Sequence, residues 1–136
     1  FCDYIEEEGD FDNVNVVMKG SKGELVTIIN SRHSAFGYDQ RIEVFGPKGM
    51  LVTENLTPSN VKLYTKDVTT SGLPYMDFFL ERYAVSYRNE LKAFLKGIED
   101  GKQYNASYDD GRAALMLADA ALESSRTGKT VKVNLN

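Results

Sequence analysis

The sequence predicts an α+β fold: an open, largely antiparallel β-sheet with two helices packed on one face. In the first half of the chain, apolar and polar residues alternate with the period of a half-buried strand. Tight-turn sequences separate these segments, so consecutive strands should run antiparallel. The second half changes to helical spacing in two long stretches, and a run of strands followed by helices is typical of α+β domains.

Five strands are expected in the first half. Val14, Val16 and Met18 alternate with polar residues, and a turn at 20–23 joins this strand to the next, which is rich in Val and Ile. A second turn, Gly-Pro-Lys-Gly at 46–49, has Pro to fix φ and Gly to supply conformational freedom at its end. In order, the expected strands are 14–18, 25–32, 40–45, 50–53 and 61–65, and residues 54–60 and 66–75 are expected to be turn-rich connections.

The first expected helix lies between residues 76 and 98. Apolar residues recur there with helical spacing along one stripe. Gly97 and Gly101 lie near its expected end. The stripe consists of Leu80, Ala84, Tyr87, Leu91, Phe94, Leu95 and Ile98.

The second expected helix runs from about residue 109 to residue 126. Ser107, three residues before Asp110, is a capping signal, and the carboxylates at the helix start favour the positive end of the helix dipole. Gly128 ends the helix. Beyond it, apolar and polar residues alternate over 131–135, which predicts a final strand.

Two helices cover only one face of such a sheet, which leaves the other face to water or to a partner. The second strand carries Leu25, Val26, Ile28 and Ile29, so apolar side chains point to both of its faces. A sheet that is apolar on both sides, with helices for only one, predicts association through the bare face. We therefore expect a homo-oligomer that forms through the open sheet face.

Length and composition place the chain among ordinary globular domains and disfavour one class of partner. Its 136 residues are about one domain's length, and 42% of them are hydrophobic, which is enough for one modest core. The net charge of −4 argues against a nucleic-acid partner, because phosphate recognition normally needs a basic surface. No apolar stretch reaches the ~18 residues of a membrane helix, so no membrane partner is expected.

Cysteine and histidine are too scarce for an internal disulfide or a zinc site. A single cysteine, Cys2, favours a cytoplasmic location, and the single histidine, His33, lies far from it in sequence. Two glycosylation sequons, at 55–57 and 105–107, are read as chance. The chain starts at Phe1 rather than Met, and we expect it to be a piece of a longer protein.

Motifs for nucleotide binding and for triad catalysis are absent or out of place. No Gly-x-Gly occurs, so the dinucleotide fingerprint is missing. The run Gly-Lys-Thr at 128–130 imitates the end of a phosphate loop, but Glu123 stands where that loop needs Gly. His33 has Ser31 and Ser34 beside it in sequence, and such adjacency does not supply the geometry of a triad.

The most informative segment is 30–41, which connects two strands and is dense in hydrogen-bond donors. Arg32, Tyr38 and Gln40 could converge on a polyhydroxylated ligand, because hydroxyls need both donors and acceptors. The alternative is a polar hairpin loop with an aromatic anchor. The aromatic residues at 78–83 likewise fit the packing of a core.

Several blocks of the sequence form one pattern. The specific block is Gly-Tyr-Asp-Gln-Arg-Ile-Glu-Val-Phe-Gly at 37–46, preceded by Asn-Ser-Arg at 30–32. The remaining blocks are Gly-Asp-Phe-Asp-Asn at 9–13, Phe-Phe-Leu-Glu-Arg-Tyr at 78–83 with Tyr87, Glu90 and Phe94, and the segment that starts with Asp110-Gly111-Arg112. Nearly the whole chain, in register, resembles the glucose–fructose oxidoreductase / inositol dehydrogenase / MocA (Gfo/Idh/MocA) family, and within it the bacterial inositol 2-dehydrogenases.

The resemblance implies a two-domain oxidoreductase. In this family a Rossmann domain binds NAD(P), and a C-terminal α+β domain of the dihydrodipicolinate-reductase-like type binds substrate and forms oligomer contacts. Residues 1–136 resemble this C-terminal domain, without the Rossmann domain. The family's Glu-Lys-Pro motif with its catalytic lysine is absent from the chain, and Ile29 stands four residues before His33, where the Asp-x-x-x-His pair would need Asp. The resemblance therefore implies that this chain has no catalytic, cofactor-binding or metal-binding residues and is inactive alone.

For the whole enzyme, the resemblance implies oxidation of myo-inositol to the 2-keto-inositol by hydride transfer to NAD. Tyr38 is then expected to bind the polyol substrate, with Arg32 and Asn30 nearby. The alternatives are a dehydrogenase for another sugar or polyol in the same family, and a non-catalytic ligand-binding or assembly module.

Overall fold

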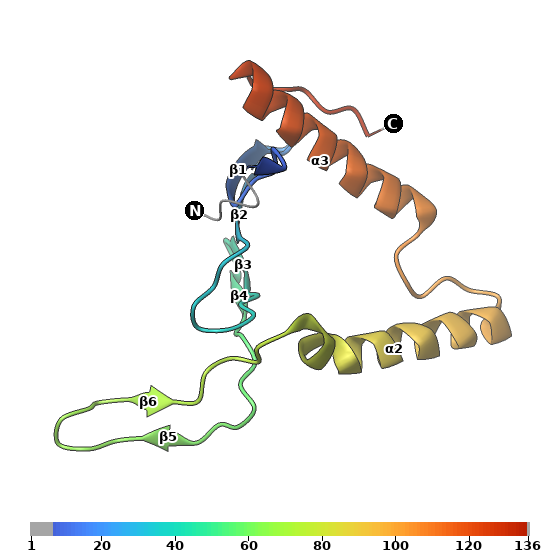
Figure 1. Ribbon diagram of the computed structural model, residues 1–136. Helices are drawn as coiled ribbons and strands as arrows, with labels where there is room; N and C mark the ends of the chain where they lie inside the picture. Colours follow the sequence, from blue (N-terminus) through green and yellow to red (C-terminus); the bar gives the residue numbers. More distant parts are fainter. Residues whose placement is uncertain (1–6, 136) are drawn as a thin grey trace. The chain divides into compact units, whose positions relative to one another are not determined.

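The computed structural model describes residues 7–135, so the prediction on Cys2 lies outside the described residues. The described chain divides into two compact units, one of 7–15 with 27–85 and one of 16–26 with 86–135. Six strands and two helices are described (Figure 1). They are, in order, β1 (Asn13–Lys19), β2 (Leu25–Ser31), β3 (Ile42–Gly46), β4 (Gly49–Thr53), β5 (Lys62–Leu63), β6 (Ser71–Gly72), α2 (Phe79–Asp100) and α3 (Tyr108–Thr127).

β1 and β2 pair with each other, as the alternation predicts. Val14, Val16 and Met18 are half-buried, whereas the residues between them are exposed. At the turn, the backbone N–H of Gly20 donates to the carbonyl of Glu24 over 2.8 Å. Every residue of β2 is exposed, with Leu25 and Ile29 at 78% and Val26 and Ile28 at 44% and 42%.

β3 and β4 form an antiparallel hairpin closed by the predicted Gly-Pro-Lys-Gly turn. Gly49 in this turn has a φ of +139°, which residues with a side chain rarely adopt. The register places Val44 opposite Leu51 on one face and Phe45 opposite Met50 on the other. These four side chains are all more than half exposed, so both faces of the hairpin are apolar and open.

β5 and β6 form a short third hairpin of two residues each. The strand expected at 61–65 stops early because Thr65 turns the chain. Its hydroxyl accepts the N–H groups of Asp67 and Val68, and its own N–H donates to the carbonyl of Val68 over 2.9 Å. Such local bonds from a side chain compete with a strand ladder. β6 lies in a segment that is expected to be a connection. A strand of two residues is too short to show an alternation of apolar and polar residues.

α2 starts three residues later than the apolar pattern predicts. The N–H of Met76 donates to the carbonyl of Leu56 (3.3 Å), and the carbonyl of Met76 accepts from the N–H of Tyr38 (2.8 Å). These bonds tie residue 76 to two other segments instead of a helical turn. At the other end, α2 runs through Gly97 to Asp100, two residues beyond the predicted 98, and Gly101 follows with a φ of +62°, so Gly101 is the stop.

α3 has the predicted caps at both ends. The Ser107 hydroxyl accepts from the N–H of Asp110 (3.1 Å), and the carboxylate of Asp110 accepts from the N–H of Ser107 (2.7 Å). This reciprocal pair is a capping box. At the C-terminus, Gly128 adopts a φ of +66° and donates its N–H to the carbonyl of Ser124 over 2.9 Å.

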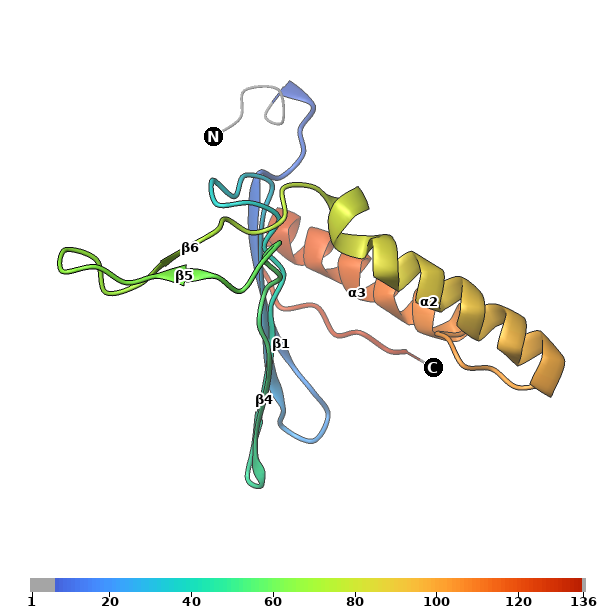
Figure 2. The same cartoon turned by 90° about the horizontal axis from the view of Figure 1, so that it is seen from below.

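The final strand predicted at 131–135 is not formed, since these residues join no strand pairing among the described residues. Val131 and Val133 are half-buried between exposed neighbours. The alternation therefore predicts which side chains are buried, but it does not predict a strand with which this segment would pair. The described strands pair as three two-stranded sheets rather than as one continuous sheet. The predicted α+β class, with antiparallel strands and two long helices, is confirmed (Figure 2).

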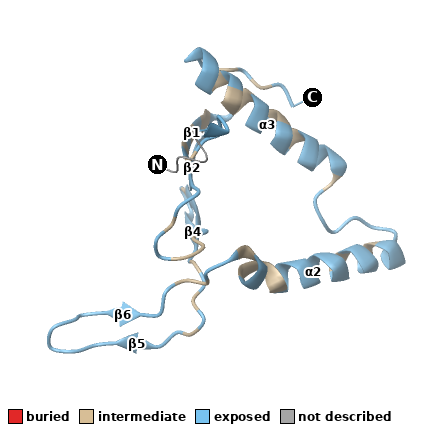
Figure 3. Ribbon diagram, in the orientation of Figure 1, coloured by how far each residue is buried: buried red, intermediate tan, exposed pale blue. Residues whose placement is uncertain are grey.

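Large apolar side chains are exposed in each of the two units. In the first unit Phe45 is 82% and Leu51 75% exposed, and in the second unit Leu25 is 78% exposed. None of the described residues is fully buried (Figure 3). Each unit therefore leaves a large part of its own apolar surface open.

Candidate functional site

Tyr38 lies in the connection between β2 and β3 and is held at three points. Its backbone N–H donates to the carbonyl of Met76 over 2.8 Å, and its own carbonyl accepts from Asn55 Nδ2 over 3.1 Å. Its ring meets the ring of Tyr83 edge to face, with centroids 5.6 Å apart and planes at 82°. The half-buried Tyr38 is thus placed by three segments that are distant in sequence.

Gly37 lets the chain approach a neighbouring backbone closely. Its φ is +108°, and a Cβ at this position would lie 2.8 Å from the carbonyl oxygen of Tyr75 and 3.1 Å from that of Met76. Beside it, the carbonyl of Phe36 accepts the N–H of Tyr75 over 3.3 Å. Only glycine satisfies both the positive φ and the short approach, so Gly37 determines how Tyr38 meets this segment.

Asp39 and Arg41 form a two-point ion pair. Arg41 Nε donates to Asp39 Oδ1 over 3.0 Å, and Arg41 Nη2 donates to Asp39 Oδ2 over 2.7 Å. These hydrogen bonds and the charge of Asp39 raise the pKa of Arg41 above its usual value. Asn55 Nδ2 also donates to Asp39 Oδ1 over 3.0 Å. Both carboxylate oxygens of Asp39 therefore already accept hydrogen bonds from the chain.

Gln40 and Tyr38 both contact Tyr83, which lies in the first turns of α2. Tyr83 Oη donates to Gln40 Oε1 over 2.8 Å, while the Tyr83 ring packs against Tyr38. The guanidinium carbon of Arg82 lies 5.8 Å from the centroid of the Tyr83 ring. The structure thus brings together two of the three side chains that the sequence suggested could converge.

Arg32, the third of those side chains, makes contacts with the segment before β1. Arg32 Nη1 donates to Asp10 Oδ2 over 2.8 Å, and the backbone N–H of Arg32 donates to the carbonyl of Asp12 over 2.9 Å. Its side chain is about half exposed, at 54%. Asn30 is exposed and lies in β2, two residues earlier. The roles of these residues and of Tyr38 in binding a substrate stay predictions.

His33 and Ser31 are not arranged as a base and a nucleophile. The hydroxyl of Ser31 donates to the carbonyl of His33 (3.0 Å) and accepts the backbone N–H of the same residue (3.2 Å). The imidazole Nε2 of His33 lies 3.7 Å from Asp12 Oδ1. The Ser31 hydroxyl is thus bound to the backbone of His33 and not to its imidazole.

An open hollow of about 410 Å³ lies beside the Tyr38 connection, lined by Phe36, Arg41, Leu73, Pro74 and Tyr75. The rings of Phe36 and Tyr75 meet edge to face in it, with centroids 5.8 Å apart. Its lining combines an apolar wall with the guanidinium of Arg41. This is the mixture that ligand sites use, in which apolar contacts give area and a few polar groups give orientation.

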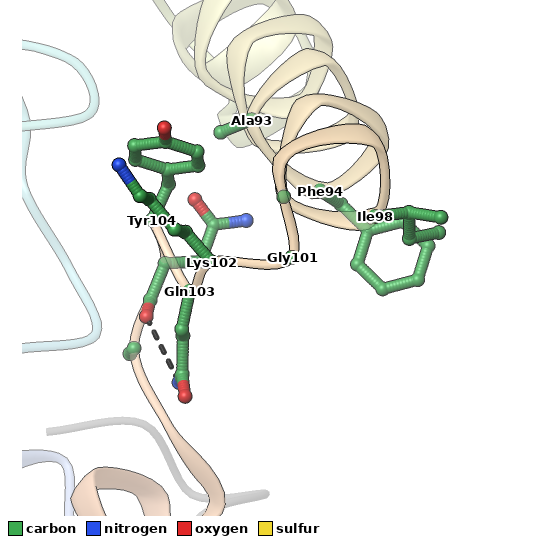
Figure 4. Close-up of a pocket in the computed structure, with 10 residues that line it drawn as sticks. Ala93, Phe94, Ile98, Gly101, Lys102, Gln103 and Tyr104 are labelled. Atoms are coloured by element: carbon green, nitrogen blue, oxygen red, sulfur yellow. Dashed lines mark hydrogen bonds between the residues drawn. The ribbon is translucent and has the colours of Figure 1, made fainter.

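A second hollow, of about 380 Å³, lies between the end of α2 and the connection at 101–106 (Figure 4). Tyr104 lies on the same side of the helix as Ala93, whereas Phe94 and Ile98 point to the other side. The connection folds back on the helix through a bond from the N–H of Lys102 to the carbonyl of Gly97, at 3.0 Å. Its mainly apolar lining suits a polyol less well than the first hollow does.

The described residues around Tyr38 combine several polar group types in one place. Around Tyr38 they supply phenol, amide and guanidinium groups, which are partners for hydroxyls. In residues 7–135, no group of three or more His, Cys, Asp or Glu side chains is placed to hold a metal ion. None of the helices in this range is long and apolar enough to cross a membrane.

Two residues of this arrangement are not predicted by the sequence. Asn55 is visible only as the start of a sequon, and Tyr83 fits the packing of an amphipathic helix equally well. The one available signal for Asn55 is its place, two residues after the end of β4 and at the start of a connection. Asparagine in such a place often binds loop backbone, but the pattern does not name the partner.

Comparison with known proteins places the chain in one family. Residues 4–133 match the model of an oxidoreductase family, described as its C-terminal alpha/beta domain. Among solved structures, the chain is similar to a myo-inositol dehydrogenase from Corynebacterium glutamicum ATCC 13032, with 48% sequence identity and a TM-score of 0.92. That match covers 98% of this chain and 40% of the other.

Two curated relatives agree with this match. An inositol 2-dehydrogenase of Rhizobium meliloti (strain 1021) is 44% identical over 120 residues, which are 88% of this chain and 36% of the relative. A myo-inositol 2-dehydrogenase of Thermotoga maritima is 43% identical over 129 residues, which are 95% of this chain and 38% of the relative. The chain therefore spans little more than a third of the length of these relatives.

Proposed function

This chain belongs to the Gfo/Idh/MocA oxidoreductase family as its C-terminal alpha/beta domain, and we propose that the whole protein is an NAD-dependent inositol 2-dehydrogenase. The observation that carries the proposal is the match to relatives with that name at 43–44% identity over most of this chain. The similar solved structure, at 48% identity, bears the name of a myo-inositol dehydrogenase and supports the same substrate.

In the proposed reaction, a ring carbinol of myo-inositol loses a hydride to NAD and a proton to a base, which leaves the 2-keto-inositol. The described strands of this chain pair in twos, and none of them belongs to a strand–turn–helix unit of the kind that holds a pyrophosphate. We place NAD, and the groups that transfer the proton, on the remainder of the whole protein.

The contribution of this chain is to hold the ring in one orientation. We propose Tyr38, Arg32 and Asn30 as polyol-binding residues. A phenol and an amide each donate and accept, and a guanidinium donates, so together they match a ring that carries hydroxyls all round. Holding one ring carbon in a fixed orientation against the cofactor raises the rate of hydride transfer.

We also propose that the protein is a homo-oligomer and that it works in the cytoplasm, where an NAD-dependent oxidation has its cofactor. Support for the oligomer comes from β3 and β4, whose two faces both expose apolar side chains. A second copy against one of these faces would remove that surface from water.

The test is an activity screen of the full-length protein over a panel of polyols and sugars. We expect NADH formation, followed by absorbance, with myo-inositol as the substrate of highest kcat/KM and with NAD preferred to NADP. A higher kcat/KM for another polyol or sugar would replace inositol by that substrate. Absence of any NAD or NADP reduction across the panel would remove the dehydrogenase proposal.

A further inference from the structure

We propose that Asn55 is the positioning residue for Tyr38, and that its side-chain amide sets the affinity of the whole protein for its polyol. The inference rests on the proposed function in one respect, because it takes Tyr38 as a substrate-binding residue. It adds a residue outside the blocks of resemblance, in a connection between β4 and β5 that carries no recognisable motif.

The amide of Asn55 uses both of its donor hydrogens on the Tyr38 connection. Nδ2 donates to the carbonyl of Tyr38 over 3.1 Å and to Asp39 Oδ1 over 3.0 Å. Its Oδ1 accepts the N–H of Leu56 over 2.9 Å. The asparagine side chain has two donor hydrogens and an acceptor oxygen on one small group, whereas aspartate, serine and alanine lack this combination.

Asn55 completes the fixation of the backbone at Tyr38. The N–H of Tyr38 is already bound by Met76, and Asn55 binds the carbonyl, so both polar groups of this residue are paired. Tyr38 lies outside the described strands, and the Asn55 amide donates to its carbonyl as the backbone N–H of a partner strand would. Without it, the carbonyl of Tyr38 loses the hydrogen bond that ties it to the connection after β4.

The position of this backbone determines the position of the ring. Tyr38 packs edge to face on Tyr83, and Tyr83 in turn donates to Gln40, which follows in the same connection. A shift at residues 38 and 39 therefore moves the phenol relative to the first turns of α2. Loss of a half-buried hydrogen bond that orders a binding residue typically weakens binding by about tenfold.

The test uses three variants of the full-length protein. Asn55→Ala removes the amide, Asn55→Asp keeps the oxygen that accepts from Leu56 but loses both donors, and Asn105→Ala is the matched control. Asn105 also donates its Nδ2 to a backbone carbonyl, that of Glu90 over 3.1 Å, in the connection between α2 and α3. Both asparagines thus tie a connection to distant backbone, and only one of them ties Tyr38.

We expect Asn55→Ala to raise the KM for myo-inositol by about tenfold, with the KM for NAD unchanged. Asn55→Asp should raise it at least as much, because a carboxylate would face the carboxylate of Asp39. Asn105→Ala should keep the wild-type KM, whatever it does to thermal stability.

If Asn55→Asp behaves as the wild type, or if the two alanine variants change KM alike, Asn55 has only a general structural role. Should Asn55→Ala fail to fold, Asn55→Ser, which keeps one donor, takes its place with a smaller expected rise.

Amide hydrogen exchange separates this inference from the proposed function. Both Asn55 variants should exchange faster than the wild type at residues 37–41, and Asn105→Ala should not. If the whole protein does not oxidise myo-inositol, the proposed function fails, but faster exchange at these residues still supports the positioning role. Unchanged exchange there overturns the role, whichever substrate the protein uses.

Discussion

Gly37 is a residue at which both the backbone conformation and a close neighbour exclude another side chain. It combines a φ of +108° with a carbonyl oxygen of Tyr75 only 2.8 Å from the place of a Cβ. Replacing Gly37 by Ala in the full-length protein should therefore cost both backbone strain and a shift of the facing segment. We expect the free energy of unfolding to fall by about 2 kcal/mol or more, measured by denaturant titration.

Gly23 supplies the matched control for this prediction. Its φ of +93° is as unusual for other residues, but nothing lies within 4 Å of a Cβ there. Gly23→Ala should lower the free energy of unfolding only by the backbone strain, about 1 kcal/mol. Equal losses in the two variants would show that the close approach to Tyr75 costs nothing.

At the same scale, the sequence predicts the residue types of the candidate site better than their partners. The connection at 30–41 stands out by its donors, and Tyr38 and Gln40 do come together, on Tyr83. Asn55 is beyond such prediction, because the bond from its side chain to Tyr38 joins residues 17 apart in sequence. A local pattern carries no information about a contact of that separation.

The capping box of α3 gives an element-scale prediction on pH. Hydrogen bonds from the backbone and the hydroxyl of Ser107 lower the pKa of Asp110 below its usual value of 3.8. A carboxyl whose pKa is lowered by folding stabilises the fold above its unfolded pKa and stops doing so as pH falls through the lower, folded value. Asp110→Asn should therefore be less stable than the wild type at pH 7, and the difference should shrink below about pH 4.

Thermal unfolding of the full-length protein between pH 7 and pH 3 measures this difference. Asp109→Asn is the control, because it also removes a carboxylate from the first turn of α3 but leaves the capping box intact. Its effect should be the smaller one that a charge near the helix dipole gives. A pH dependence as large for Asp109→Asn as for Asp110→Asn would assign the effect to the dipole and not to the box.

Elements with complete local signals are the ones that the sequence predicts correctly. α3 has its Ser107 cap and its Gly128 stop, and β1 has its alternation, and all of these are confirmed. Where a boundary depends on a distant partner, the sequence prediction fails. α2 begins after residue 76 because Met76 is bonded to two other connections, and 131–135 lacks a partner strand despite its alternation.

At the scale of the whole molecule, the exposed apolar side chains are the dominant physical fact. Phe45, Leu51 and Leu25 are each at least three-quarters exposed. A two-stranded hairpin with bare apolar faces is marginal alone, so we infer that the other parts of the whole protein and a second copy provide the cover.

Substitutions on the two faces of the β3–β4 hairpin can distinguish contacts within one copy of the protein from contacts with a second copy. Leu51 lies on one face and Phe45 on the other, so Leu51→Glu and Phe45→Glu each place a charge on a single face. In the full-length protein, the variant on the face covered within the same copy should lose stability at every protein concentration. The variant on the face covered by a second copy should lose assembly, seen as a lower molar mass by light scattering and a stability that no longer rises with concentration.

Glu43 provides the control for this last experiment. It lies on the same face as Phe45 and already carries a charge, so Glu43→Gln should change neither stability nor molar mass. If Leu51→Glu and Phe45→Glu both keep the wild-type molar mass and both lose stability, each face is covered within one copy and no oligomer forms through this hairpin. The exposed layer would then be closed by the remainder of the same protein, and assembly would have to use a different surface.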